Sequence, residues 1–344
     1  GKNHLEESLQ IFRKIGDKRG EATALHFLSY RITLAETLAS AQHMAEQSLA
    51  LYKQLNDPVG QAKLLTQLSL VHDYQGHTEE ALNLIQQARI IAGQCGVVDA
   101  ADDNRLAVAL MHGGRFQEAR QISQESIQNI EQMEIETEML AWRYNTLGRI
   151  HIHLGDFRLA QQAAERANQI FVELRKQQHP FFLRTLGLVF LAKGSYDRSA
   201  EALTYNLSWQ DEVDDANQLP RASAHVDQCY LNWRMGRPAE IRRHMKAALE
   251  IGSRHGTFLV TLRLLPVAAL VALDHSNRRL THSLITLGNR YPYIKDSHWY
   301  TTVALNELHR RLAALPATER AFAETQGRAL TLPEMSAELL TLLA

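Results

Sequence analysis

A period of about 40 residues runs through the chain and restricts it to repeat architectures. Glycines that mark short turns recur every 38 to 42 residues, at Gly76, Gly114, Gly155, Gly194 and Gly236. A second series of similar positions, spaced by 38 to 41 residues, interleaves with the first. Each unit therefore reads as a helix, a tight turn, a second helix and a connector. Such units bury their apolar faces by stacking on their neighbours, which predicts a solenoid.

Residues 141–167 show the pattern within one unit. Residues at the helical period form one face of a first helix: Tyr144, Leu147, Gly148 and His151. Gly155 follows, and glycine readily takes the left-handed conformation that ends a helix. A second helix begins at Phe157 and carries small residues on one face: Ala160, Ala164 and Ala167. Since an interior glycine such as Gly148 costs a helix about 1 kcal/mol, we expect close helix packing there.

The composition agrees with an all-helical chain and excludes several classes of protein. The 344 residues include 18 glycines and 8 prolines, a low share that disfavours β-sandwiches and barrels. The net charge is −1, whereas a nucleic-acid-binding chain is usually basic. Two cysteines, Cys95 and Cys229, exclude a disulfide framework. The most apolar run, residues 258–273, is shorter than a membrane span, so we expect a cytoplasmic protein without membrane contact.

The units resemble the tetratricopeptide repeat (TPR), whose unit of roughly 34 residues has a conserved order of large, small and glycine positions. One unit fits through Tyr144, Leu147, Gly148, His151, Gly155, Phe157, Ala160 and Ala167. Others fit through Leu65, Leu68, Gly76, Ala81 and Ala88, through Leu106, Gly114, Phe116 and Ala119, and through Leu183, Leu186, Gly187, Phe190, Gly194 and Tyr196. Three units depart from the pattern: Glu36 replaces the turn glycine in one, Pro266 lies inside a helix of another, and a third has polar residues at positions that are normally apolar, namely His225, Gln228 and Asn232.

The resemblance implies an all-α, right-handed superhelical α-solenoid forming a single domain over residues 1–344. We expect a half repeat at 2–19, then repeats at about 20–59, 60–99, 100–138, 139–179, 180–220, 221–258 and 259–296, and C-terminal capping helices at 297–344. Because a half repeat exposes an apolar face, we also expect that an upstream domain precedes this chain in a longer protein.

A narrower resemblance concerns the connectors. Residues 15–20 and 55–60, and the phrase at 327–334, are similar to the C-terminal TPR sensor regions of bacterial STAND-type signal-transduction ATPases and transcriptional regulators. No nucleotide-binding GxxxxGK[ST] motif lies in these residues, and GxSxG and HExxH are also absent. We therefore expect no catalytic residue, metal site or cofactor within the chain.

In the TPR family the first helix of each unit lines a concave groove, and this implies a set of candidate ligand-binding residues. Carried over unit by unit, they are Tyr30, Lys63, Gln67, Tyr74, Asn104, Arg105, Trp142, Asn145, Arg149, His153, Phe181, Arg184, Asp227, Tyr230, Trp233 and Arg234. Arginine suits a carboxylate or phosphate, because its planar fork binds both oxygens. Aromatic side chains and arginines also dominate binding hot spots. The packing alternative is that some of these residues contact the neighbouring helix or form ion pairs across the groove.

Two functions remain open from the sequence. The first is a sensor whose groove binds a protein segment, a peptide or a small anionic effector and thereby switches a larger signalling ATPase or regulator. The second is a constitutive protein–protein interaction scaffold. An enzyme is disfavoured because no nucleophile and base occur in a recognisable arrangement. Nucleic-acid binding through the arginines is disfavoured by the net charge of −1.

Overall fold

The computed structural model describes residues 2–96, 100–132, 137–212, 218–313, 317–318, 321 and 330–343, and within these residues the secondary structure is entirely helical. The helices are α1 (Lys2–Ile15), α2 (Lys18–Ala35), α3 (Leu38–Gln54), α4 (Pro58–Gln75), α5 (Thr78–Gln94), α6 (Ala100–His112), α7 (Phe116–Glu131), α8 (Glu138–Leu154), α9 (Phe157–Arg175), α10 (Pro180–Ala192), α11 (Tyr196–Glu212), α12 (Gln218–Arg234), α13 (Pro238–His255), α14 (Phe258–Asp274), α15 (Arg278–Gly288), α16 (Pro292–Lys295), α17 (His298–Tyr300), η2 (Thr301–Leu305), α18 (Asn306–Leu312) and α20 (Leu332–Leu343).

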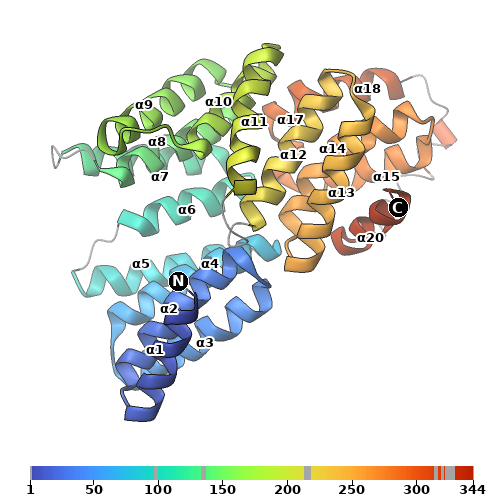
Figure 1. Ribbon diagram of the computed structural model, residues 1–344. Helices are drawn as coiled ribbons and strands as arrows, with labels where there is room; N and C mark the ends of the chain where they lie inside the picture. The colour runs from blue at the N-terminus through green and yellow to red at the C-terminus, as the bar shows by residue number, and fades with distance from the viewer. Residues whose placement is uncertain are drawn as a thin grey trace.

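Helices α2 to α15 form consecutive pairs, and the even-numbered helix of each pair packs most extensively on the helix that follows it (Figure 1). The pairs begin within three residues of the predicted starts of the repeats from 20–59 to 259–296, and α1 lies within the residues of the predicted half repeat. The all-α solenoid predicted from the sequence is therefore observed. Connector residues 97–99, 133–136 and 213–217, and residues 327–329 of the 327–334 phrase, lie outside the described residues.

Local signals in the sequence explain where the helices begin and end. The carboxylates of Asp17 and Asp57 accept hydrogen bonds from backbone amides in the first turns of α2 and α4, which satisfies donors that lack helical partners. The turn residues Gly76 and Gly155 have φ of 86° and 81°, the left-handed conformation expected of them. Helix α14 runs unbroken through Pro266, which is buried within it.

Small residues allow the paired helices to approach closely. The predicted alanines of α9, Ala160, Ala164 and Ala167, are fully buried. A Cβ atom added at Gly148 would lie 3.2 Å from the carbonyl oxygen of Ala160, so α8 rests directly on the backbone of α9. This contact explains the interior glycine of α8.

Replacing Gly148 by leucine is expected to lower the free energy of unfolding by about 1–3 kcal/mol or more, because the backbone of α9 blocks the new side chain. Urea denaturation followed by circular dichroism measures the loss. The matched control is Gly93→Leu in α5, where an added Cβ meets no atom within 4 Å. Equal stability of the two variants would contradict the close packing of α8 on α9.

The solenoid curves until its C-terminal repeats contact its N-terminal repeats. Helix α12 packs on α2, and α14 packs on α4. The Thr257 hydroxyl donates to the backbone carbonyl of Tyr74 over 2.9 Å, and the His255 ring bonds to the backbone carbonyl of Glu36. Leu219 of α12 joins Ile32 of α2 in one hydrophobic cluster. These contacts close the concave side into an enclosed space that repeat patterns alone do not predict.

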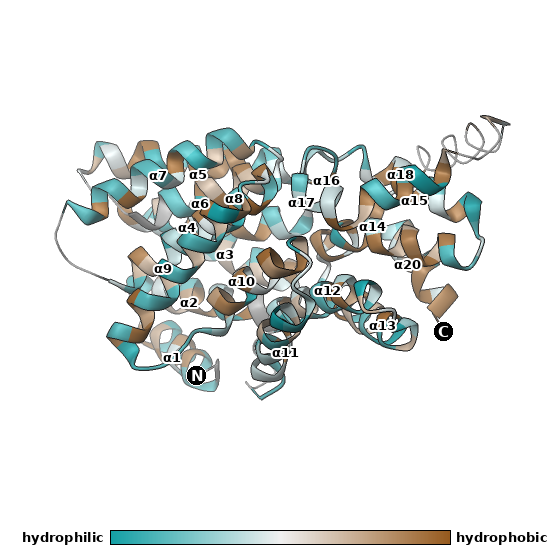
Figure 2. Ribbon diagram, turned by 90° about the horizontal axis from the view of Figure 1, so that it is seen from above, coloured by the Kyte–Doolittle hydropathy of each residue, from teal (hydrophilic) through white to brown (hydrophobic). Residues whose placement is uncertain are grey.

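The C-terminal segment, predicted to cap the solenoid, divides into two parts. Helix α20 packs on α13 and α14 as a cap does, and Figure 2 shows hydrophobic residues along α14 and α20. Helices α17 and η2 instead contact α8, α10 and α14 on the concave side. The prediction of a purely capping segment is corrected here, because α17 reaches into the enclosed space.

Candidate functional site

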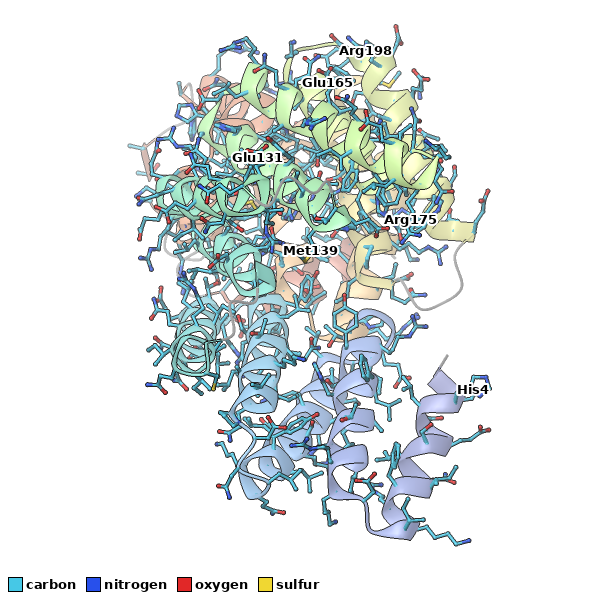
Figure 3. The ribbon with its side chains drawn as sticks, turned by 90° about the vertical axis from the view of Figure 1, so that its left-hand side faces the viewer. His4, Glu131, Met139, Glu165, Arg175 and Arg198 are labelled. Atoms are coloured by element: carbon cyan, nitrogen blue, oxygen red, sulfur yellow. The ribbon has the colours of Figure 1, made fainter. Side chains whose placement is uncertain are left out.

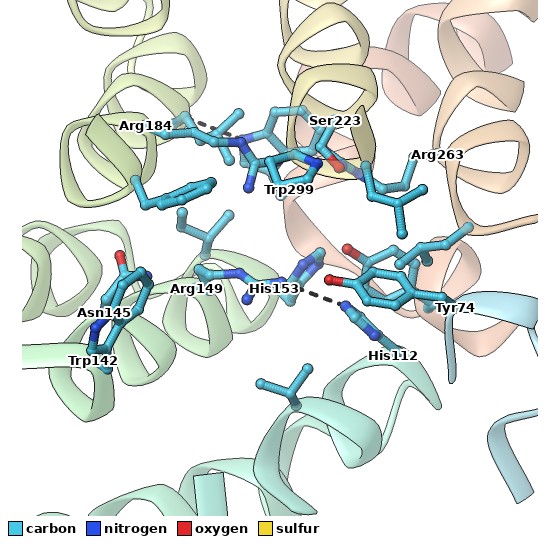
Figure 4. A pocket seen from close by; sticks show the side chains of 18 of the residues that line it. Tyr74, His112, Trp142, Asn145, Arg149, His153, Arg184, Ser223, Arg263 and Trp299 are labelled. Atoms are coloured by element: carbon cyan, nitrogen blue, oxygen red, sulfur yellow. Dashed lines mark hydrogen bonds between the residues drawn. The ribbon is translucent and has the colours of Figure 1, made fainter. Parts of the chain in front are cut away.

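The enclosed space contains a cavity of about 310 Å³. Its wall takes side chains from the first helix of every repeat, α2 to α14, together with α16 and α17 (Figure 4). The lining residues are Tyr30, Tyr74, Val108, His112, Trp142, Asn145, Arg149, Ile152, His153, Phe181, Arg184, Leu188, Leu219, Pro220, Ser223, Leu259, Arg263, Tyr293, Trp299 and Tyr300. We call this space the central pocket. Its volume lies at the lower end of the roughly 300–1,000 Å³ typical of small-ligand sites.

Aromatic side chains from the C-terminal segment form one wall of the central pocket. The indole nitrogen of Trp299 donates to the backbone carbonyl of Leu188 over 3.1 Å, which ties α17 to α10. The ring of Tyr300 packs against that of Trp299, with 5.0 Å between centroids. His153 Nδ1 lies 2.8 Å from the Ser297 hydroxyl, and burial holds the pKa of His153 well below its ordinary value. This wall is therefore fixed by hydrogen bonds as well as by apolar contacts.

A buried carboxylate links three successive first helices beneath the pocket. Asp227 of α12 is 1% exposed and accepts from Arg184 of α10, whose Nε and NH2 groups both contact it. Arg263 of α14 donates to Oδ1 of the same carboxylate over 2.5 Å, and Arg184 contacts this oxygen as well. Burial acts to lower the pKa of Arg263, but Asp227 and nearby tyrosines hold it above its ordinary value. One carboxylate thus serves two guanidinium groups, and the cluster keeps a net positive charge.

A second buried carboxylate joins α4 to α6. Asp73 Oδ2 accepts from Arg105 and lies 2.8 Å from His112 Nδ1. Burial acts to raise the pKa of Asp73, but His112 and Arg105 hold it below its ordinary value. Burial also lowers the pKa of His112, so its ring is neutral at pH 7. Its Nδ1 then carries the proton donated to Asp73, and Nε2 is left as an acceptor.

Arg149 of α8 extends across the central pocket toward His112 (Figure 4). One of its NH2 groups lies 3.4 Å from His112 Nε2. Among the described residues no carboxylate lies within ion-pair distance of Arg149. Burial is the main cause that lowers the pKa of Arg149, and Arg184 and Arg263 add to it. Arginine nevertheless stays charged in proteins, so the pocket contains a cation without a counter-ion.

The structure places half of the predicted groove residues in the central pocket and half elsewhere. Those that line it are Tyr30, Tyr74, Trp142, Asn145, Arg149, His153, Phe181 and Arg184. Those that do not are Lys63, Gln67, Asn104, Arg105, Asp227, Tyr230, Trp233 and Arg234. Tyr230 is buried and donates to the backbone carbonyl of Arg263, Lys63 is exposed, and Trp233 lines a separate cavity bounded by α12–α15 and α20.

The structure gives three of the four arginines among the candidate groove residues a partner within the protein, as the packing alternative allows. Arg105 and Arg184 form ion pairs with buried carboxylates, and Arg234 donates to the backbone carbonyl of Thr302. Gln67 also has a partner on another helix: its side-chain amide donates to the hydroxyl of Thr33 of α2 over 2.9 Å. Buried polar groups need partners, and here the neighbouring first helix supplies them. Of the four, Arg149 and Arg234 form no ion pair in the described part of the chain, and of these two only Arg149 lines the central pocket.

Several pocket residues were not predicted from the sequence. Tyr293 lies at the end of the last predicted repeat, and Trp299 and Tyr300 lie in the segment predicted to cap the solenoid, so none of the three was expected in the groove. Arg263 carried a usable signal, because an arginine inside the most apolar helix of the chain needs a buried partner. That partner is Asp227, which the sequence analysis placed in the groove.

Metal-ligating groups, apolar helices and cysteine thiols add no further candidate site among the described residues. Within the described residues, no group of three His, Cys, Asp or Glu side chains is placed to hold a metal ion. No helix in the same residues is long and apolar enough to cross a membrane. Cys95 is exposed and Cys229 is buried, and both are free thiols.

Comparisons with known proteins agree with this architecture. The family described as tetratricopeptide repeat matches residues 100–171. A Rap protein solved in complex with competence and sporulation factor superposes with a TM-score of 0.63, over 86% of this chain and 76% of that one, at 14% identity. The apo form of the quorum sensor NprR from B. thuringiensis superposes with a TM-score of 0.53, over 98% of this chain and 97% of that one, at 12% identity.

The apo form of RapI gives a TM-score of 0.52 over 85% of this chain and 99% of that one, at 16% identity. No curated protein sequence matches this chain. At such low identity the structural likeness establishes the fold alone, and the matched repeats supply the sequence evidence. Residues 100–171 therefore carry the sequence signature of the tetratricopeptide repeat, and the chain as a whole shares the helical-repeat fold of these solved structures.

Proposed function

We propose that this protein is a ligand-binding TPR module whose central pocket takes a peptide segment or a small effector. The observation that carries the proposal is the pocket itself. First helices from seven repeats converge on it, aromatic rings form its wall, and Arg149 enters it without an acidic partner among the described residues. Pockets that combine apolar walls with a few directed polar groups are typical of ligand sites.

The structural neighbours also support a ligand-binding role. One Rap protein was solved with competence and sporulation factor bound, and NprR is described as a quorum sensor. A sensor role in a larger signalling ATPase or transcriptional regulator fits the connectors at 15–20 and 55–60, which resemble those of STAND-type proteins. Ligand would act by binding two conformations of the larger protein with different affinity. In a constitutive scaffold, the same pocket would hold a partner permanently.

Arg149→Glu is expected to abolish capture of the pocket ligand from a lysate of the native host, because it reverses the charge at the centre of the pocket. Mass spectrometry of proteins, peptides and small molecules retained by the wild type and by the variant measures the loss. Arg105 and Arg184 are left unchanged, since their ion pairs hold helices together. The matched control is Lys63→Glu, the same charge reversal on an exposed residue outside the pocket.

Identical material retained by the wild type and by Arg149→Glu would overturn the proposal, since a partner would then use another surface. A second measurement separates a sensor from a scaffold. Addition of the captured ligand to the full-length host protein should change its ATP turnover or target binding if the module is a sensor. An unchanged rate would favour the scaffold.

A further inference from the structure

The central pocket holds more positive charge than the protein itself balances. Of the described lining residues, none is Asp or Glu, while three are arginines: Arg149, Arg184 and Arg263. Arg184 and Arg263 share the single carboxylate of Asp227 beneath the wall. Within the described part of the chain, Arg149 has only the ring nitrogen of His112 as a partner. A buried cation without a partner destabilises a fold, so its presence is explained if a ligand supplies the missing anion.

The guanidinium of Arg149 is held in a defined orientation. Asp73 is fully buried and fixes the His112 ring through Nδ1, over 2.8 Å. The ring then presents Nε2 to one NH2 group of Arg149. A hydrogen-bonded chain from Asp73 through His112 thus orients Arg149 and leaves its remaining N–H groups for a ligand. The fork of an arginine matches the two oxygens of a carboxylate.

The surroundings of Arg149 indicate what the anion is attached to. Tyr293, Trp299 and Phe181 line the same cavity and give it apolar walls. The amide oxygen of Asn145 accepts from Thr185 over 2.7 Å, and its amide nitrogen donates to no group in the described part of the chain. The site therefore offers a charged fork, an amide donor and apolar walls within about 310 Å³.

We propose that Arg149 binds a carboxylate that carries an apolar or aromatic group. This inference rests on the proposed function, because it names the ligand chemistry of the same pocket. Two sources supply such a carboxylate: the C-terminus of a short peptide and a small organic acid. His112 is a positioning residue that acts through Arg149.

The test uses two random libraries, one of tetrapeptides and one of N-acetyl amino acids, each prepared with free carboxylates and as C-terminal amides. Members retained by the immobilised protein are identified by mass spectrometry, and the dissociation constants of the best binders are measured by calorimetry. We expect free acids to bind about 30-fold or more tightly than the matching amides, because an amide leaves a buried charge unpaired. Preference for tetrapeptides or for single acids identifies the source.

Arg149→Gln should remove the preference for acids, so that acids and amides bind it equally weakly. The matched control is Arg175→Gln, an exposed residue of α9 on the outer surface that pairs with Glu138 (Figure 3). His112→Phe should weaken acids but leave amides unchanged, whereas His112→Gln restores binding because its amide oxygen also accepts from Arg149. A structural role for His112 alone would weaken both classes equally.

The outcomes separate this inference from the proposed function. Acids and amides that bind the wild type equally well would overturn the carboxylate assignment and leave the central pocket as a ligand site. Absence of binding by both library types would also overturn it, while lysate capture that depends on Arg149 would still uphold the pocket. A melting temperature that falls in Arg149→Gln by about 4 °C or more would show that the protein itself satisfies this arginine, again against the inference.

Discussion

Asp227→Asn is expected to lower the free energy of unfolding by about 3–5 kcal/mol. The reason is the position of Asp227 between Arg184 and Arg263, with only 1% of the residue exposed. Neutralising this carboxylate leaves two buried guanidinium groups facing each other without a counter-ion. Equilibrium unfolding in urea, followed by circular dichroism, measures the change.

The control for this prediction is Asp211→Asn. Asp211 also pairs with an arginine, Arg221, but both side chains are more than a third exposed, so the expected loss is about 0–1 kcal/mol. A loss below about 1 kcal/mol for Asp227→Asn would mean that solvent reaches the cluster and that the pocket is more open than described.

Gly114→Ala is expected to lower the free energy of unfolding by about 2–5 kcal/mol through two effects. Gly114 has φ of 77°, a conformation that disfavours any residue with a Cβ atom. An added Cβ would also lie 2.4 Å from Pro292 Cβ and 2.9 Å from the backbone nitrogen of Tyr293. The α6–α7 turn and the α16 segment would have to separate, which displaces one wall of the pocket.

Gly194→Ala isolates the first effect, the cost of the backbone conformation. Gly194 occupies the corresponding turn two repeats later with φ of 76°, but an added Cβ there meets no atom within 4 Å. It should therefore show only the backbone penalty of about 1–2 kcal/mol. Urea unfolding of both variants gives the difference, and equal losses would contradict the close contact between the α6–α7 turn and Pro292.

The fold could be predicted because its signals are local and repeated. Gly76, Gly155 and their counterparts end helices by backbone conformation, and the alanines of α9 mark the face where helices meet. Each signal lies within one unit and recurs in the next. Stacking of such units then follows from the burial of their apolar faces.

The pocket could be predicted only in part, because it depends on contacts between distant units. The repeat register correctly placed Arg149 and Arg184 on the concave side, but it gave no information on partners. Whether an arginine is free or paired depends on the neighbouring helix, as Asp227 shows for Arg184. Tyr293 and Trp299 line the pocket because the C-terminal repeats contact the N-terminal repeats. The repeat pattern contains no signal that predicts this contact.

The contact of α14 with α4 also limits how this protein can evolve. An open solenoid accepts the gain or loss of a unit, because each unit touches only its neighbours. In this protein the Thr257 hydroxyl donates to the backbone carbonyl of Tyr74, which lies 183 residues earlier in the sequence. This hydrogen bond forms only when the number of repeats between the two residues places them next to each other. Duplication or deletion of one repeat would remove this hydrogen bond and the contact of α14 with α4, and it would open the pocket. The contact between the two ends of the array therefore restricts the number of repeats, which an open solenoid leaves free.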